Sequence, residues 1–305
     1  MKSITVAALS TLALSLALAV AHAQQLDKPA LTPDLDYLLD GNANNLPTVD
    51  RSISAWEAGS IPQDCKDIGE GEGHSASDFE VYSVQYNDCG DPWLFCRHKD
   101  VEVSIDTAAE TFSKIPVSAR DWVRQILLLP GANSAFAING NVAFIGTTGQ
   151  NIDVMLHETA HGLDGFAAFG ESFSSSDGFL AAYDADTHVP DNYAQSSQAE
   201  NVAQNTVVAV YDVNVLGGFP GVQENYAAIQ NQYSYIRDKA GDALVPGGTC
   251  DRHLENSETV QVDGAAKRSY SRVMGARGVK PESAFKGKYT NIVKDFEPFS
   301  YREAF

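Results

Sequence analysis

The segment that most constrains the fold is "DVMLHETAHGLDG", from Asp153 to Gly165, because it contains the pattern H-E-x-x-H. On an α-helix His157 and His161 lie about 40° apart, so both imidazoles can bind a single metal ion. Glu158 lies about 100° round the helix from His157, where its carboxylate can reach a metal-bound water but is poorly directed to bind the ion. The pattern therefore predicts a helix with two Zn²⁺ ligands and a general base.

A catalytic zinc site needs a third protein ligand and leaves one position open for water. Glu200 is the best candidate, because it lies near the start of another predicted helix, over about residues 197–215, which can face the first helix across the ion. Glu200 also completes a capping box with Ser197, and this alternative needs no metal. Three weaker candidates lie in a loop-like stretch: Asp177, Asp184 and His188.

Asp164 follows His161 by three residues on the same face of the helix. It is positioned to accept a hydrogen bond from a ligand imidazole, the usual partner of a metal-bound histidine. The alternative is a residue at the end of the helix that faces water. Because Asp164 and Ala167 stand where the longer metzincin motif has glycine and a third histidine, that motif is absent.

The region before the metal helix predicts a β-hairpin over residues 134–149, because two apolar runs flank the turn sequence Asn139-Gly140-Asn141. We expect its second arm to be an edge strand beside the metal helix. An extended peptide substrate would then pair along residues 141–146.

The remaining pattern of helices and hairpin strands favours the α+β class, with a zincin-like domain. The predicted elements are a strand over 78–86, a helix from Thr107 that stops before Pro116, a helix from Ala119 that is broken at Pro130-Gly131, and the metal helix, capped by Thr147 or Thr148 and ended by Gly165 or Gly170.

Residues 1–23 are typical of a secretory signal peptide: Lys2 precedes an apolar run that ends in Ala21-His22-Ala23. We therefore expect a secreted, extracellular protein, and no later stretch is apolar enough to span a membrane. Residues 24–75 are expected to be an acidic, loop-rich segment, with "GEGEG" as a solvated loop. Residues 76–305 are expected to form the catalytic domain, with the metal core over about 134–216. Whether a pro-segment is removed between residue 24 and about residue 60 stays open.

The chain has four cysteines, and export to an oxidising compartment favours two disulfides. Four cysteines allow three connectivities. We favour a local Cys89–Cys96 bridge, with Cys65 joined to Cys250. No C-x-x-C pattern is present, which argues against a thiolate zinc site.

The formal net charge of −19 argues against nucleic acid or an anionic membrane as a partner. The expected partner is a peptide or protein substrate. Nothing in the sequence indicates an oligomeric state.

H-E-x-x-H with a distant Glu200 resembles the gluzincin class of zinc peptidases. Tyr193, seven residues before Glu200, and the aspartate of "HETAHGLD" resemble the lethal-factor-type peptidases within that class. The secreted, cysteine-poor framework is similar to fungal conidiation-specific secreted proteins that carry the same motif. The resemblance covers mainly residues 142–212.

This resemblance implies that the Tyr193 hydroxyl stabilises the oxyanion or assists the leaving amine; the alternative is a surface aromatic residue. The family often has a second glutamate four residues after the ligand, where this chain has Gln204. The difference removes no ligand but is expected to weaken the surroundings of the metal.

Two functions follow from these features. The first is a zinc metalloendopeptidase with Zn²⁺ on His157, His161 and Glu200, and Glu158 as general base. The second is a non-catalytic secreted, cell-surface or spore-associated protein that keeps a structural zinc site. A serine or cysteine hydrolase is disfavoured, because no G-x-S-x-G is present and disulfides would consume the cysteines.

Overall fold

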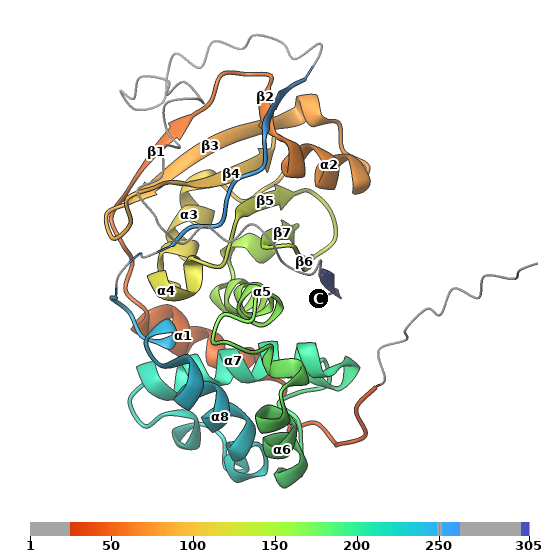
Figure 1. Cartoon of the computed structure of the whole chain (residues 1–305), viewed down its shortest axis with the longest axis vertical. Coiled ribbons are helices and arrows are strands. Elements are labelled where there is room, and N and C mark those ends of the chain that lie inside the picture. Colours follow the sequence, from red (N-terminus) through yellow and green to blue (C-terminus); the bar gives the residue numbers. More distant parts are fainter. Residues whose placement is uncertain (1–24, 249, 251, 263–299, 305) are drawn as a thin grey trace, which may run out of the picture.

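The computed structural model describes residues 25–248, 250, 252–262 and 300–304, and it contains a mixed sheet with helices on both faces (Figure 1). The α+β class is confirmed. The predicted signal peptide, residues 1–23, lies outside the described residues. Among the described residues, no helix has the length and apolar character needed to cross a membrane.

The main sheet has seven strands in the order β1-β3-β4-β5-β7-β6-β9. Strand β5 pairs in parallel with β4 and β7, and the other neighbours are antiparallel. Strands β2 and β8 form a separate pair. The strands are β1 (Arg51–Ala55), β2 (Ser60–Pro62), β3 (Phe79–Tyr86), β4 (Trp93–His98), β5 (Gln125–Leu129), β6 (Ser134–Ile138), β7 (Asn141–Ile145), β8 (Thr259–Gln261) and β9 (Ser300–Ala304).

The helices divide between the sheet and a separate helical layer. Helices α3, α4 and α5 lie on one side of the sheet and α2 on the other, while α6, α7 and α8 lie beyond α5 (Figure 1). The helices are α1 (Leu39–Asn45), α2 (Gln63–Gly71), α3 (Ile105–Ser113), α4 (Val117–Arg120), α5 (Ile152–Gly165), α6 (Asp177–Ala185), α7 (Gln198–Asn214) and α8 (Gln230–Ala240).

Strand β5 lies where a helix from Ala119 was predicted, and that prediction is wrong. Helix α4 ends at Arg120, and the apolar run that follows is a fully buried central strand. Its side chains alternate between two cores: Ile126 and Leu128 join the core on the α5 side, and Leu127 and Leu129 the core on the α2 side. A strand buried on both faces is apolar at every position, so its sequence lacks the alternation that distinguishes a strand from a buried helix.

The predicted hairpin is confirmed as β6 and β7. Its turn residues Asn139 and Gly140 have φ of 51° and 81°, as a two-residue turn between twisted strands requires. However, β7 lies between β5 and β6, so residues 141–146 do not form an edge and the predicted substrate position is wrong. The outer side of β6 pairs with β9 instead.

The metal helix α5 ends at Gly165, as predicted, but begins later than predicted. Neither Thr147 nor Thr148 caps it. The Asn151 side chain accepts hydrogen bonds from the backbone N–H groups of Asp153 (2.9 Å) and Val154 (3.2 Å). Asparagine serves as well as threonine at this position, because each offers a side-chain oxygen to the free N–H groups of the first turn.

Residues 25–75 contain α1, β1, β2 and α2, where a loop-rich segment was expected. Strand β1 pairs with β3 and so belongs to the main sheet. The first part of the "GEGEG" run lies in α2 rather than in a loop. A Cβ atom at Gly69 would lie 2.6 Å from Phe79 Cζ, so the glycine allows α2 to pack closely on the start of β3.

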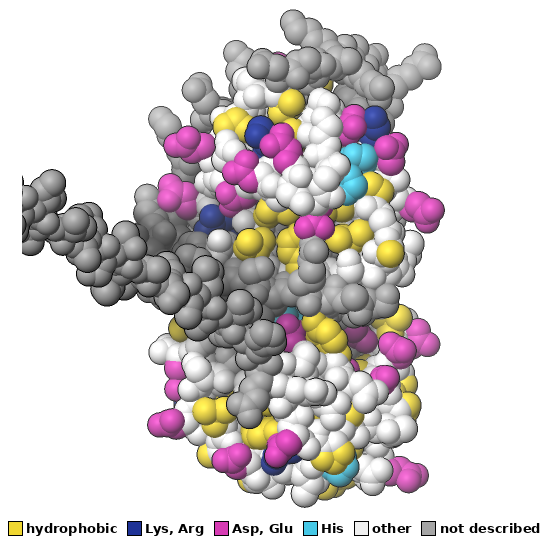
Figure 2. Space-filling view, turned by 90° about the vertical axis from the view of Figure 1, so that its right-hand side faces the viewer, with side chains coloured by type: hydrophobic (Ala, Val, Ile, Leu, Met, Phe, Trp, Pro, Cys, Tyr) yellow, Lys and Arg dark blue, Asp and Glu magenta, His cyan; other side chains and the backbone are white. Residues whose placement is uncertain are grey.

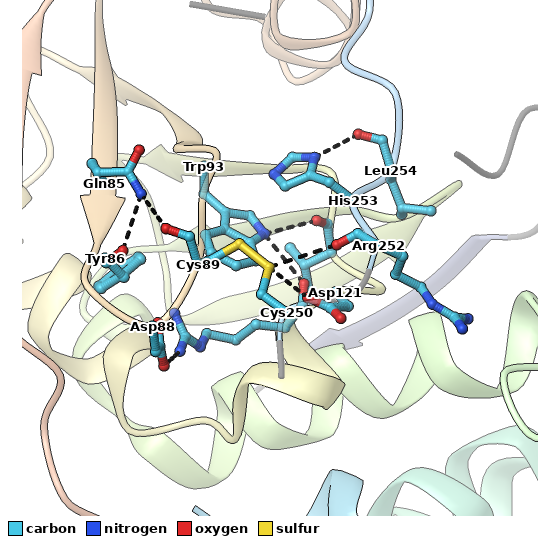
Figure 3. Close-up of a disulfide and its surroundings, with 12 residues drawn as sticks. Gln85, Tyr86, Asp88, Cys89, Trp93, Asp121, Cys250, Arg252, His253 and Leu254 are labelled. Atoms are coloured by element: carbon cyan, nitrogen blue, oxygen red, sulfur yellow. Dashed lines mark hydrogen bonds and ion pairs between the residues drawn. A yellow bond between two sulfur atoms is a disulfide. The ribbon is translucent and has the colours of Figure 1, made fainter. Parts of the chain in front are cut away.

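The disulfides are Cys65–Cys96 and Cys89–Cys250, so the predicted pairing is wrong. Figure 3 shows the Cys89–Cys250 bridge. The presence of two disulfides is as predicted. Cys89 and Cys96 belong to different cores, on opposite faces of the sheet. Proximity in sequence therefore does not bring these two sulfur atoms together.

Candidate metal centre

Two helices bring the three predicted ligands together. His157 and His161 lie one turn apart on α5, and Glu200 lies in the first turn of α7, which packs against α5. The two Nε2 atoms are 3.0 Å apart, and Glu200 Oε2 lies 3.0 Å from His157 Nε2 and 3.1 Å from His161 Nε2. All three residues are buried, with exposed fractions of 2%, 0% and 6%. Three donor atoms thus converge on one point.

This arrangement fits Zn²⁺. Bonds of about 2.0–2.1 Å in a tetrahedral site place the ligand atoms about 3.3 Å apart, close to the observed separations. Two imidazole nitrogens with one carboxylate oxygen form a known donor set of catalytic zinc sites, with a fourth position for water. His157, His161 and Glu200 are therefore the residues that would hold the ion.

Ser197 caps α7, as the sequence also predicted, because its Oγ accepts a hydrogen bond from the Glu200 N–H at 3.2 Å. The cap uses the Glu200 backbone, whereas the Glu200 carboxylate faces the two histidines. The capping and ligand interpretations of this residue are therefore compatible.

The Glu200 carboxylate is electrostatically suited to bind a cation. Burial by itself raises its pKa, but hydrogen bonds from His157 and His161 outweigh burial and lower the pKa to about 2. An ionised carboxylate is the form that binds a metal ion.

Glu158 is also buried, with an exposed fraction of 0%, and lies next to His157 on α5. Tyr193 is half-buried, and its ring centroid lies 5.7 Å from that of His157. Tyr193 immediately precedes the short 3-10 turn Ala194–Ser196, which leads into α7. Both predicted catalytic residues therefore lie next to His157, Glu158 as its neighbour on α5 and Tyr193 by its ring.

Asp164 has partners other than the ligand imidazoles. Its carboxylate accepts hydrogen bonds from Ser172 Oγ (3.1 Å), Ser174 N (2.9 Å) and Ser174 Oγ (2.6 Å). Asp164 is the penultimate residue of α5, so its side chain reaches the chain that turns back after the helix. Its observed hydrogen bonds therefore hold the 172–174 turn rather than a histidine.

Gln204 and Asp191 provide the interaction that was expected of Asp164. Gln204 Oε1 lies 3.2 Å from His157 Nδ1, and Gln204 Nε2 donates to Asp191 Oδ2 at 2.6 Å. The sequence marked Gln204 only as a departure from a family pattern. It contained no signal for Asp191, because no helical spacing links a loop residue to α7.

Comparison with known proteins agrees with one part of the sequence interpretation. The family model for the conidiation-specific protein Con-13 matches residues 34–290. The chain belongs to the Con-13 family. It is similar to conidiation-specific protein 13 of Neurospora crassa, with 31% identity over 232 residues, which cover 73% of this chain and 67% of the relative. No solved structure matches the chain.

The weaker ligand candidates of this Con-13 family member do not belong to the group formed by His157, His161 and Glu200. Asp177 and Asp184 are exposed on α6, and the His188 Nδ1 atom lies 2.9 Å from Thr187 Oγ1. Among the described residues, one other group of potential metal-binding side chains lies close together, but it contains Cys89 and Cys250, which are disulfide-bonded.

The surface of the Con-13 family chain is strongly acidic. Acidic side chains are spread over the face shown in Figure 2, where Lys and Arg side chains are few. This agrees with 40 Asp and Glu residues against 21 Lys and Arg residues in the whole sequence. Such a surface repels anionic polymers and membranes.

Proposed function

We propose that this Con-13 family protein is a secreted zinc metallopeptidase with a zincin-like catalytic domain. The supporting observation is the convergence of His157, His161 and Glu200 on one point, with donor atoms 3.0–3.1 Å apart. Glu158 is also part of the H-E-x-x-H pattern, although a structural site has no need of a general base. The two disulfides are consistent with secretion.

Bound Zn²⁺ would polarise the scissile carbonyl and lower the pKa of the attacking water. Glu158 would accept the proton of that water and transfer it to the leaving amine. Tyr193, whose ring lies beside His157, would donate a hydrogen bond from its hydroxyl to the oxygen that becomes negatively charged. His157, His161 and Glu200 would hold the ion in place.

The substrate would be an extended peptide, and the outer side of β6 is the sheet position best placed for it. Strand β6 lies against α5, and β9 already pairs with β6 in the antiparallel direction. A peptide that adds to this side of β6 would form the hydrogen bonds that β9 forms now. Substrate binding at this position would therefore require β9 to leave.

A structural zinc site in a cell-surface or spore-associated protein is the second candidate. The very low exposure of the three ligands favours it, because a buried ion stabilises a fold without access for a substrate. The printed name of the Neurospora relative refers to conidiation and to no reaction.

Glu158→Gln separates the two functions. The variant is expected to keep one zinc ion per chain and to lose at least about a hundredfold in peptide cleavage, because a general base contributes about 10²–10⁴-fold. Zinc content is measured on the secreted protein, and cleavage with a library of fluorogenic peptides.

His157→Ala and Glu200→Ala are the companion variants, and both are expected to lose zinc. Equal zinc content in the wild type and in both variants would refute the metal site. Zinc in the wild type, together with undiminished cleavage by Glu158→Gln, would refute the mechanism only.

A further inference from the structure

A chain of hydrogen bonds runs from the buried His157 through the half-buried Gln204 to the buried Asp191, and it defines which nitrogen of His157 can bind metal. A glutamine amide carries a donor at one end and an acceptor at the other. Because Asp191 offers only acceptors to Gln204 Nε2, the oxygen Oε1 must be the atom that faces His157 Nδ1. His157 Nδ1 must then carry a proton, which leaves the Nε2 lone pair for the ion.

The Asp191 carboxylate is held firmly. Asp191 is buried, with an exposed fraction of 5%, and its Oδ1 atom accepts a hydrogen bond from Ala194 N at 2.8 Å. The Asp191 carboxylate reaches the His157 imidazole only through Gln204, whereas in the usual arrangement a carboxylate contacts the imidazole directly. The neutral amide of Gln204 thus replaces the expected glutamate without leaving the imidazole undirected.

The loop that carries Asp191 is bound on both sides by the N-terminal segment, residues 26–31. Before Asp191, the Val189 backbone exchanges hydrogen bonds with this segment: Leu31 N to Val189 O (2.9 Å) and Val189 N to Pro29 O (3.0 Å). After Asp191, Leu26 N donates to Gln195 O at 2.7 Å. The segment therefore fixes the loop at both ends.

Lys28 anchors the same segment to α6. Its ammonium group donates to the backbone oxygens of Tyr183 and Asp186, near the C-terminus of α6, and lies 4.4 Å from the centroid of the Tyr183 ring. A cation at a helix C-terminus is favoured by the helix dipole and satisfies free carbonyl groups. The position of the segment is therefore specific.

We infer that Asp191 and Gln204 are positioning residues for the ligand His157, and that residues 26–31 hold Asp191 in place. The N-terminal segment is then a part of the metal centre rather than a removable pro-segment. This inference rests on the proposed zinc site but not on peptidase activity.

Zinc affinity of the full secreted chain tests the pair, measured by competition with a chromophoric chelator. Gln204→Ala is expected to weaken zinc binding about 10–100-fold, the usual effect of losing such a partner. Gln204→Glu combined with Asp191→Asn should restore most of the affinity, because the new carboxylate can accept from His157 Nδ1 and from the amide that replaces the Asp191 carboxylate. Asn192→Ala is the matched control, since this exposed neighbour of Asp191 bonds to Asp34 instead.

A double-mutant cycle tests whether the two residues act as a unit. Asp191→Asn combined with Gln204→Ala is expected to be no weaker than Gln204→Ala alone, because the first change then has nothing left to orient. Lys28→Ala is expected to weaken zinc binding less than Asp191→Asn, and the two effects should not add. Full additivity would refute the link from the N-terminal segment to Asp191.

The hydrogen bond of His157 Nδ1 in the zinc-loaded protein gives a readout that a general loss of stability would not change. Imidazole ¹⁵N NMR is expected to show an Nδ1–H that exchanges slowly with water in the wild type, because Gln204 Oε1 accepts it, and exchanges rapidly in Gln204→Ala. If the wild type and Gln204→Ala bind zinc with equal affinity, this inference is refuted, whereas the proposed function is not. A wild type that binds no zinc would refute the proposed function as well.

Discussion

The sheet region and the helical layer are held together by different means. Both disulfides attach to the β3–β4 part of the sheet region, where Cys96 lies on β4 and Cys89 just after β3. The fully buried Arg120 pairs with Asp88 and lies 4.7 Å from the centroid of the Tyr86 ring. Because these contacts involve no metal, we expect this region to keep its fold when zinc is removed.

The helical layer contains no cysteine between the start of α6 and the end of α8. Its interior is instead tied by side-chain hydrogen bonds: Asn201 Nδ2 donates to Gln232 Oε1 at 2.8 Å, and Gln232 Nε2 donates to Asp186 Oδ2 at 3.0 Å. Such buried networks stabilise a fold only when every member is satisfied. The proposed metal ligands join α5, next to the sheet, to α7 in this layer, so bound zinc would link the less constrained region to the more constrained one.

Of the changes considered, zinc removal should therefore produce the largest difference in stability between the two regions. Chelation is expected to lower the free energy of unfolding by several kcal/mol, about 4 kcal/mol when free zinc is a thousand times its dissociation constant. Hydrogen exchange followed by mass spectrometry should show lost protection in α7 and α8, with β3, β4 and β5 still protected. Uniform loss across both regions would contradict the comparison.

Removal of one disulfide is the converse test. Cys65→Ala with Cys96→Ala opens a loop with a sequence separation of 31, which is expected to cost about 3–4 kcal/mol of stability in the loop-entropy estimate. Zinc affinity should stay unchanged, because this bridge lies on the face of the sheet away from α5. Denaturant unfolding and chelator competition measure the two quantities. Weaker zinc binding in this variant would show that the regions are coupled.

Strand β9 pairs with β6, which contacts α5, so it lies at the boundary between the two regions. Deletion of residues 300–305 is expected to lower the KM for an extended peptide by about tenfold, the equivalent of about 1.4 kcal/mol of competing interaction. The kcat value should stay the same, because no ligand or catalytic residue is touched. A solubility control is a chain in which these residues are replaced by a Gly-Ser sequence of equal length. Unchanged KM in both chains would show that β9 does not compete with substrate.

Asp153 gives the smallest effect, at the first turn of α5. Burial raises its pKa to about 7, although a hydrogen bond from Asn42 Nδ2 at 2.7 Å opposes the shift. The folded protein therefore binds this proton more tightly than the unfolded chain, and stability should fall as pH rises from about 4 to 7. Asp153→Asn, which can still accept from Asn42, should stabilise the protein by about 1 kcal/mol at pH 8, and not at pH 4. Thermal unfolding at both pH values measures this, and equal shifts would contradict the assignment.

The local patterns of the sequence predicted the parts of the site that lie on single helices. The spacing of His157 and His161 defines one helix face wherever that helix lies, because the helix repeat is fixed by backbone hydrogen bonds. The Ser197 cap likewise placed Glu200 in the first turn of α7. The α+β class and the β6–β7 hairpin followed from the same kind of short-range signal, in which a turn or a cap depends on neighbouring residues only.

Tertiary structure alone decided which distant segments meet. Strand β5 was misread as a helix because burial on both faces removes the alternation of side chains that identifies a strand. The disulfides were mispaired because Cys89 and Cys96 lie in cores on opposite faces of the sheet, and their closeness in sequence does not show this. Asp191 was missed because its role comes from a loop that the N-terminal segment holds against α7. Helices, turns and caps depend on backbone hydrogen bonds between near neighbours, so a short stretch of sequence predicts them. Contacts between distant segments depend on how the whole chain packs, which no short stretch of sequence specifies.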